Sequence, residues 1–149
     1  MASNVANSDL GCVLNSPDSL FAGPASQEKI RQAEQDLGVT FPPGYRDFLR
    51  DCGAVVAPGL ELYGITAPTS EPPLFQDVVT VNRALRRQEQ MGADRPLHFA
   101  IADDGEGAYY FMVGAGDKDP SVYMIGPDCD RRAATNLADF LQTKFDRLE

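Results

Sequence analysis

Residues 26–53, SQEKIRQAEQDLGVTFPPGYRDFLRDCG, decide the fold, because they encode two short amphipathic helices joined by a Phe-Pro-Pro step. Ser26 is a suitable N-cap for the first helix. Gly38 ends this helix, since a glycine adopts the left-handed conformation that satisfies the carbonyls of a final turn. The residues that recur at helical spacing and form the apolar face are Ile30, Ala33 and Leu37. We therefore predict a helix over residues 26–37.

The two prolines mark the start of the second helix. Pro43, or alternatively Pro42, fits the first helical position, where a missing backbone N–H costs nothing and the fixed φ is already helical. Gly53 ends this helix. Its apolar face consists of Tyr45, Phe48, Leu49 and Cys52. The helix pair therefore specifies a fold, whereas its polar faces carry no arrangement that catalysis would need.

The middle of the chain predicts the start of a sheet and a third helix. Apolar residues alternate along residues 60–65, and this short strand should begin the sheet. Residues 66–76 carry three prolines, which exclude a helix interior or a central strand, so they should form a surface loop. From Asp77 to Gly92 the pattern is helical again. The apolar face of this helix consists of Val78, Val81 and Leu85.

Residues 97–125 predict a β-meander. Three aromatic or β-branched runs, LHFAIA, AYYFMV and SVYMI, are separated by clusters of Gly and Asp. The Asp-Gly step within residues 103–107 is typical of a tight hairpin. Residues 135–148 predict a terminal helix that Thr135 or Asn136 caps. Its buried stripe consists of Leu137, Phe140, Leu141, Phe145 and Leu148.

These elements are an N-terminal helix pair, an antiparallel β-meander and a C-terminal helix. A chain of 149 residues has the usual size of one domain. We expect a single domain over residues 26–149. Residues 1–25 are rich in Asn, Ser, Ala, Gly and Pro, and should form an irregular arm or a short edge element.

Composition favours a soluble protein of the cytoplasm. The chain lacks the run of about 18 apolar residues that a membrane-spanning helix needs. Its first residues contain neither a basic start nor a hydrophobic signal core. Its three cysteines, Cys12, Cys52 and Cys129, are odd in number and widely spaced, which favours free thiols in a reducing compartment over a disulfide framework.

Negative charge limits the kinds of partner. The formal net charge of −9 disfavours nucleic acids and anionic membranes, since both require clustered Lys and Arg, whereas a basic protein would suit it. Residues 101–130 hold seven acidic residues and one lysine. These acids lie either in solvated turns, which favour Asp and Gly, or in a binding surface. Tyrosines that point outward from a strand make good interface anchors. The candidate partner-binding residues are Asp103, Asp104, Glu106, Tyr109, Asp117, Asp119 and Tyr123.

The sequence predicts no enzyme and no cofactor or metal site. His98, the single histidine, is accompanied by no nucleophile motif such as Gly-x-Ser-x-Gly. The acidic turn at residues 103–106 fits no calcium loop, because an EF-hand needs further oxygen ligands that end in a bidentate Glu. Cys52 lies on an apolar helix face, which favours a packed side chain over an activated thiolate.

The order of these motifs resembles the SUKH superfamily, named after yeast cell-wall assembly regulators of the Smi/Knr type. The resemblance covers about residues 26–145. The matching positions are Ile30, Glu34, Leu37, Gly38, Phe41, Pro42, Tyr45, Phe48, Leu49 and Gly53, then Glu61-Leu62-Tyr63-Gly64, Ala102-Asp103-Asp104-Gly105, Tyr110-Phe111, Val122-Tyr123 and Phe140-Leu141. The chain departs from the family at Cys52, where members often carry Asn. It departs again at residues 126–128, where members often carry a His or an acidic pair.

The resemblance implies an α+β fold in which an antiparallel β-sheet, the meander, packs against an N-terminal helix pair and a C-terminal helix. It also implies a domain that acts by binding rather than by catalysis. Bacterial members are immunity proteins that hold a cognate toxin inactive in the cytoplasm, and the toxins include nucleases. An acidic inhibitor of a basic nuclease has a physical rationale, because opposite potentials steer the encounter. The resemblance leaves a second function open, a regulatory scaffold domain related to the cell-wall synthesis regulators. The expected partner is therefore a protein, and neither nucleic acid nor a membrane.

Overall fold

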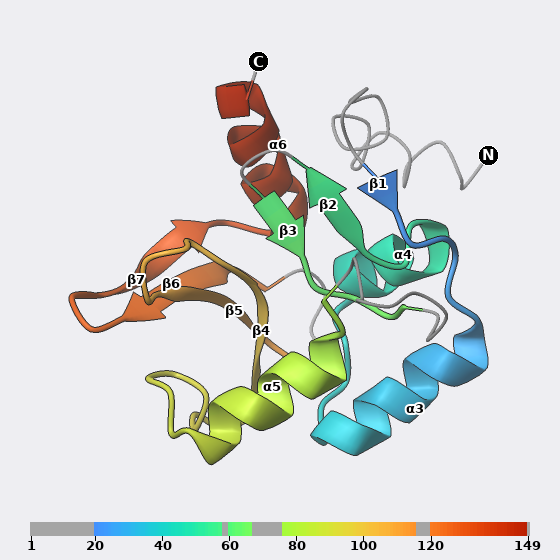
Figure 1. The fold of residues 1–149 in the computed structure, drawn as a ribbon, viewed down its shortest axis with the longest axis horizontal. Helices are drawn as coiled ribbons and strands as arrows, with labels where there is room; N and C mark the ends of the chain where they lie inside the picture. Colours follow the sequence, from blue (N-terminus) through green and yellow to red (C-terminus); the bar gives the residue numbers. More distant parts are fainter. Residues whose placement is uncertain (1–19, 58–59, 67–75, 116–119, 149) are drawn as a thin grey trace.

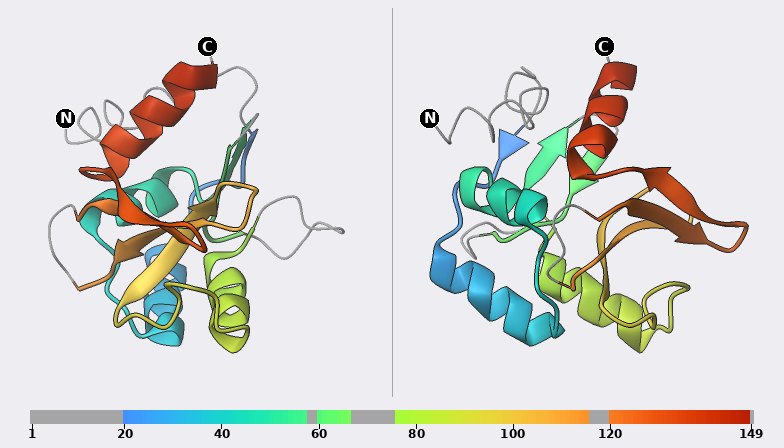
Figure 2. Two further views of the ribbon diagram at one scale, coloured as in Figure 1. Left: turned by 90° about the vertical axis from the view of Figure 1, so that its left-hand side faces the viewer. Right: turned by 180° about the vertical axis from the view of Figure 1, so that it is seen from behind.

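The computed structural model describes residues 20–57, 60–66, 76–115 and 120–148, with side chains as far as Lys144 in the last helix. Figures 1 and 2 show the arrangement. In chain order, the elements are β1 (Leu20–Phe21), α3 (Gln27–Leu37), α4 (Pro43–Asp51), β2 (Val55–Ala57), β3 (Leu60–Leu62), α5 (Val78–Arg87), β4 (His98–Asp103), β5 (Tyr109–Val113), β6 (Val122–Gly126), β7 (Cys129–Ala134) and α6 (Leu137–Leu148). The predicted α+β class is confirmed.

The helix pair forms as its caps predict. The Ser26 hydroxyl oxygen accepts a hydrogen bond from the Lys29 N–H at 3.2 Å. Gly38 adopts a φ of 71°, and its N–H donates to the Glu34 carbonyl at 2.8 Å. Helix α4 begins at Pro43 rather than Pro42, which serves as its N-cap. The seven residues predicted to form the two apolar faces are all buried: Ile30, Ala33, Leu37, Tyr45, Phe48, Leu49 and Cys52.

The strands form two antiparallel sheets, where the sequence predicted one. The first has the order β1-β2-β3 and the second the order β4-β5-β6-β7. Strand β1 is the short edge element that was one of the two possibilities for residues 1–25; the division of the chain at residue 26 stays a prediction. The two sheets meet where the Tyr63 N–H donates to the Ile101 carbonyl at 2.7 Å.

The sequence pattern did not predict two of these strands, β2 and β7. Strand β2 has only three residues, too few to show a period of two. Strand β7, CDRRAA, is the outer strand of the second sheet, and its central residues 130–132 are exposed, so it shows no apolar alternation. The expectation that the meander ends at Ile125 was therefore wrong. The turn at Pro127 and Asp128 leads into this fourth strand.

Helix α5 is shorter than predicted because the chain must turn back under the second sheet. It ends at Arg87, and the following segment brings Gly92 against the second sheet. A Cβ at Gly92 would lie 2.9 Å from the Phe111 ring and 3.1 Å from Ile125. An ion pair between Arg95 and Asp130, at 2.5 Å, ties this segment to β7. The segment therefore covers one face of β5 and β6.

Helices cover the remaining faces. Helices α3 and α5 lie side by side, as both figures show, and Arg83 lies 3.7 Å from Asp36 between them. Helix α6 lies on the far side of the molecule and packs Phe140 against Tyr110, with 4.8 Å between ring centroids. Asn136 rather than Thr135 caps this helix, since its side-chain oxygen accepts from the Asp139 N–H at 2.7 Å. In the described part of the chain, no helix is long and apolar enough to cross a membrane.

Candidate functional site

The predicted hairpin turn between β4 and β5 is built by two of its own carboxylates. Asp103 accepts a hydrogen bond from the Gly105 N–H at 2.8 Å. Asp104 accepts from the Glu106 N–H at 2.8 Å and from the Ala108 N–H at 3.0 Å. Carboxylates that accept backbone N–H groups in this way stabilise a local turn. Asp103 and Asp104 therefore have a structural role, while the Glu106 side chain at the tip of the turn is exposed.

A tyrosine that sequence reasoning did not select anchors this turn to the core. The Tyr63 hydroxyl donates to the second carboxylate oxygen of Asp103 at 2.5 Å. The Tyr63 carbonyl in turn accepts from the buried Tyr45 hydroxyl at 2.6 Å. Burial, and then the hydrogen bond to Asp103, raise the pKa of Tyr63 well above its ordinary value, so its proton stays in this bond. The sequence singled out Tyr63 only as part of the Glu61-Leu62-Tyr63-Gly64 run, one of the stretches that resemble the SUKH superfamily.

These contacts define a surface that we call the acidic corner, formed by Glu61, Asp103, Asp104, Glu106 and Tyr109. Glu61 is exposed on β3, and its charge contributes to the raised pKa of Tyr63. Tyr109 lies opposite Asp103 in the β4–β5 register and is half-buried. Burial, followed by the charges of Asp103 and Asp104, raises its pKa. Within the described residues, none of the four acids forms an ion pair. Glu61 and Glu106 are exposed, and Asp103 and Asp104 are half-buried.

Tyr123 does not belong to the acidic corner. It pairs with Phe111 and Arg132 in the sheet, and its ring lies 6.5 Å from that of His98. Its neighbours are therefore an arginine and a histidine rather than the acids of the β4–β5 turn. Asp117 and Asp119, the other two candidates, lie outside the described residues.

The two candidate catalytic side chains, His98 and Cys52, lie in surroundings that indicate structural roles. The Nδ1 atom of His98 lies 2.9 Å from the Pro96 carbonyl oxygen. Burial, and to a lesser extent the charge of Asp51, raise the pKa of the Cys52 thiol to about 11, which leaves it protonated at neutral pH. Within the residues that the structure describes, no three His, Cys, Asp or Glu side chains come together as a metal site would require.

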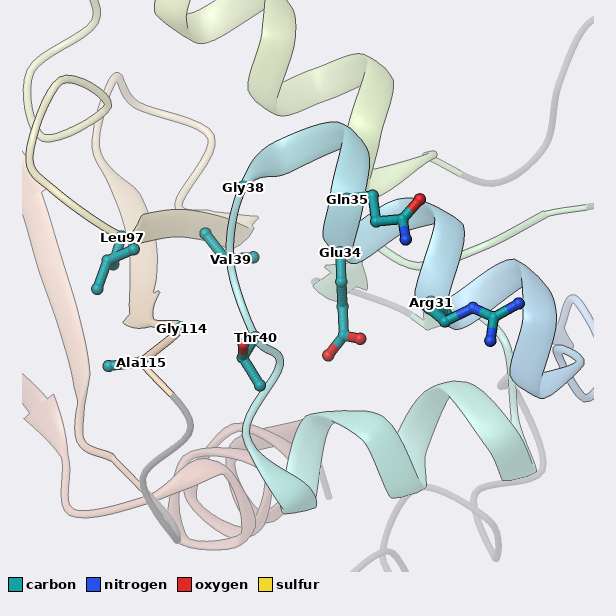
Figure 3. Close-up of a pocket in the computed structure, with 9 residues that line it drawn as sticks. All are labelled: Arg31, Glu34, Gln35, Gly38, Val39, Thr40, Leu97, Gly114 and Ala115. Carbon is teal, nitrogen blue, oxygen red and sulfur yellow. The ribbon is translucent and has the colours of Figure 1, made fainter.

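A surface depression with a volume of about 440 Å³ lies beside the C-terminal end of α3. Figure 3 shows that residues 38–40 run through it, with Leu97 on one side and Glu34 on the other. The polar side chains at its rim therefore do not converge on one point, as a small-molecule site requires. Leu97 is 43% exposed here and has a φ of 61°.

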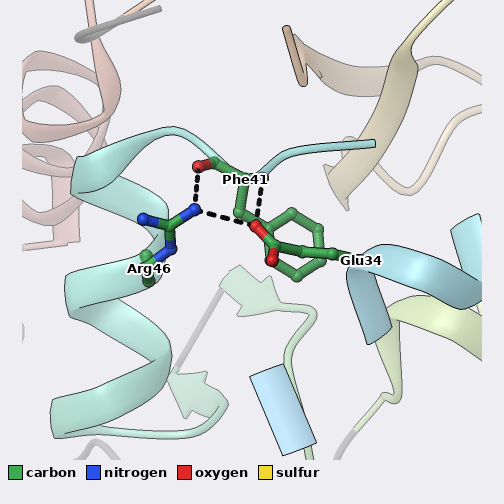
Figure 4. A network of polar contacts seen from close by, with 3 residues as sticks. All are labelled: Glu34, Phe41 and Arg46. Atoms are coloured by element: carbon green, nitrogen blue, oxygen red, sulfur yellow. Dashed lines mark hydrogen bonds and ion pairs between the residues drawn. The ribbon is translucent and has the colours of Figure 1, made fainter. Parts of the chain in front are cut away.

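Glu34 has a structural partner set that ties the helix pair together (Figure 4). One carboxylate oxygen accepts from the Phe41 N–H at 2.7 Å and from the Arg46 guanidinium at 2.9 Å. Arg46 also donates to the Phe41 carbonyl at 3.2 Å. The carboxylate is only 17% exposed, so these bonds are partly shielded from water. The network fixes the angle at which the chain passes from α3 into α4.

Two substitutions separate the parts of this network. Glu34→Ala removes both bonds and leaves the Phe41 N–H without its acceptor, and we expect it to lower the free energy of unfolding by about 2 kcal/mol. Glu34→Gln keeps an oxygen for that N–H and loses only the charge, so its cost should be about half as large. Urea denaturation followed by circular dichroism measures both values. Equal costs would mean that the ion pair alone holds the two helices.

One comparison with known proteins gives a match. A family model described as the SMI1 / KNR4 family (SUKH-1) matches residues 24–143. This range includes both sheets from β2 onward, the helix pair and the acidic corner. A search of curated proteins finds no match.

Proposed function

The chain belongs to the SMI1/KNR4 (SUKH-1) family, and on this premise we propose that it is an immunity protein that neutralises a cognate toxin by binding it directly. Domains of this family are commonly immunity proteins and are generally not catalytic. The proposed setting is the cytoplasm, where an inhibitor would meet a toxin before it reaches its target.

The acidic corner is the observation that carries this proposal. Its four acids have no ion-pair partner within the described residues, although the chain holds 13 basic residues. Tyr109 lies beside them, half-buried and therefore partly ordered before binding. A tyrosine next to a charged rim is a usual arrangement for an interface anchor. The suitable partner is a basic protein surface, such as the substrate-binding face of a nuclease.

The contribution of the charge at the acidic corner to binding can be tested without disturbing the turn between β4 and β5. Asp103 and Asp104 hold the turn, so reversal of their charges would confuse binding with folding. Glu61→Lys combined with Glu106→Lys changes only exposed side chains. We expect this double variant to lower the rate of association with the cognate toxin by about tenfold or more at low salt, and to weaken the salt dependence of that rate. Stopped-flow or surface plasmon resonance measurements give both quantities.

The matched control carries the same kind of change elsewhere. Glu28→Lys reverses an exposed charge in the first turn of α3 and should leave the association rate nearly unchanged. Growth of cells that produce the toxin together with each variant gives the biological readout. Wild-type rates in the double variant would exclude the acidic corner as the contact surface. Failure of the unaltered chain to protect these cells would exclude the immunity function and favour the regulatory scaffold.

A further inference from the structure

A small pocket lies between α6 and the second sheet, on the face opposite to Tyr109. Its volume is about 90 Å³, enough for about three water molecules at roughly 30 Å³ each. Tyr110 lines it, and neighbouring residues of one strand point to opposite faces, so Tyr109 points away from it. The other lining residues are Met124, Arg131, Ala133, Phe140, Thr143 and Lys144.

The Lys144 ammonium group is held in place at this pocket. Its Nζ donates to the Tyr110 hydroxyl at 2.8 Å. It also lies 4.7 Å from the centroid of the Tyr110 ring and 5.7 Å from that of Phe140. Because the Tyr110 oxygen accepts this bond, its own O–H remains available to donate. The ammonium group has three donors, so at least one N–H also remains for a ligand.

Arg131 brings a second cation to the same pocket from β7. It lies opposite Met124 in the β6–β7 register, which places both side chains on the face covered by α6. One terminal nitrogen of Arg131 lies 3.6 Å from the Met124 sulfur, a weak acceptor. The guanidinium group is therefore directed to the pocket by a contact that uses little of its hydrogen-bonding capacity.

The charges at this pocket are not balanced by the described part of the chain. No acidic residue lines the pocket, and within the described residues neither Arg131 nor Lys144 forms an ion pair. Two like charges that face one small space repel each other, and an anion between them would remove that cost.

We propose that this pocket binds a small oxyanion, a phosphate or a carboxylate group. An arginine fork matches the oxygens of either group, and Lys144 supplies a point charge. The hydroxyls of Tyr110 and Thr143 complete a set of four donors. The volume of about 90 Å³ is enough for one such group. This site does not depend on the proposed toxin contact, which lies on the other face of the sheet.

The test is an NMR titration of the full chain with inorganic phosphate and, separately, with acetate, each at constant ionic strength against chloride. We expect saturable shifts of the amide signals around Arg131 and Thr143. Arg131→Met removes the cation but keeps the apolar stem, and should weaken binding at least tenfold. Lys144→Met should do the same. Circular dichroism confirms that each variant is folded.

The neighbouring arginine provides the control. Arg132 follows Arg131 in β7 and pairs with Tyr123, so it points to the opposite face of the sheet. Arg132→Met makes the same change in net charge and should leave the affinity unchanged. Saturation by phosphate alone would assign the site to a phosphate group, saturation by acetate alone to a carboxylate such as the side chain of a bound protein, and saturation by both to an oxyanion of either kind. Shifts that never saturate, or equal losses in the Arg131 and Arg132 variants, would overturn the proposal.

Discussion

Replacement of Gly64 by alanine is expected to unfold most of the protein, although it adds only one methyl group. A Cβ at this position would lie 1.7 Å from the Gly53 carbonyl oxygen and 2.8 Å from the Gly53 carbonyl carbon. Both atoms belong to the backbone, so no side-chain rotation relieves the overlap. The strand end would have to move away from the end of α4.

That movement would break the hydrogen bonds that meet at Gly64. Its N–H donates to the Gln76 carbonyl at 3.0 Å, its carbonyl accepts from the Val78 N–H at 2.8 Å, and the Ile65 N–H donates to the Gly53 carbonyl at 2.9 Å. The loss should exceed about 4 kcal/mol, the range reserved for a few drastic mechanisms. Since single domains are stable by about 5–15 kcal/mol, the variant should be largely unfolded or close to it. Urea denaturation and the yield of soluble protein measure this outcome.

Gly38→Ala is the matched control, because it separates crowding from backbone conformation. Gly38 has a positive φ of 71°, which disfavours alanine, but an added Cβ would meet no atom within 4 Å. Its cost should be about 1–2 kcal/mol, the penalty for a left-handed residue. A Gly64→Ala variant no less stable than Gly38→Ala would show that the first sheet and α4 are not packed as described.

Local signals explain why the helices were predicted well. Ser26 and Gly38 act within one turn of their own helix, and their roles follow from neighbours in sequence. The closeness of Gly53 and Gly64 depends instead on how β3 returns to the end of α4, and no local pattern reports it. Strand β7 was missed for a related reason, since its exposed edge position removes the alternation that predicts a strand.

In the candidate site, too, local features could be predicted from the sequence, whereas contacts between distant residues could not. The Asp-Gly pattern predicts the turn, which Asp103 and Asp104 build, whereas Glu106 stays exposed and a binding role for these acids stays a proposal. The sequence could not assign these roles, because the bond from Tyr63 spans 40 residues. The proposed oxyanion pocket could not be predicted from the sequence either. Its Tyr110, Arg131 and Lys144 come from separate elements, and the net charge of −9 favours a basic partner rather than an anion.

Asn82→Ala is expected to cause the second-largest loss of stability, although the helical pattern placed only apolar residues on this face. Asn82 is 1% exposed, and its side chain forms hydrogen bonds with the backbone of β4. Its side-chain nitrogen donates to the Ala100 carbonyl at 3.0 Å, and its side-chain oxygen accepts from the Ala100 N–H at 2.7 Å. The strand register shifts between Ala100 and Ala102, so Asn82 supplies both hydrogen-bond partners at the irregular point of an edge strand.

Alanine at position 82 would leave the N–H and the carbonyl of Ala100 buried without these partners. Each of the two unsatisfied buried groups costs about 1–3 kcal/mol, so the free energy of unfolding should fall by about 2–6 kcal/mol. Asn136→Ala makes the same chemical change at the N-cap of α6 and should cost about 1 kcal/mol. Hydrogen exchange identifies the cause, since the Ala100 amide should lose more protection than its neighbours in β4. Equal costs for the two variants, with unchanged exchange at Ala100, would mean that water replaces Asn82 and that β4 does not depend on α5.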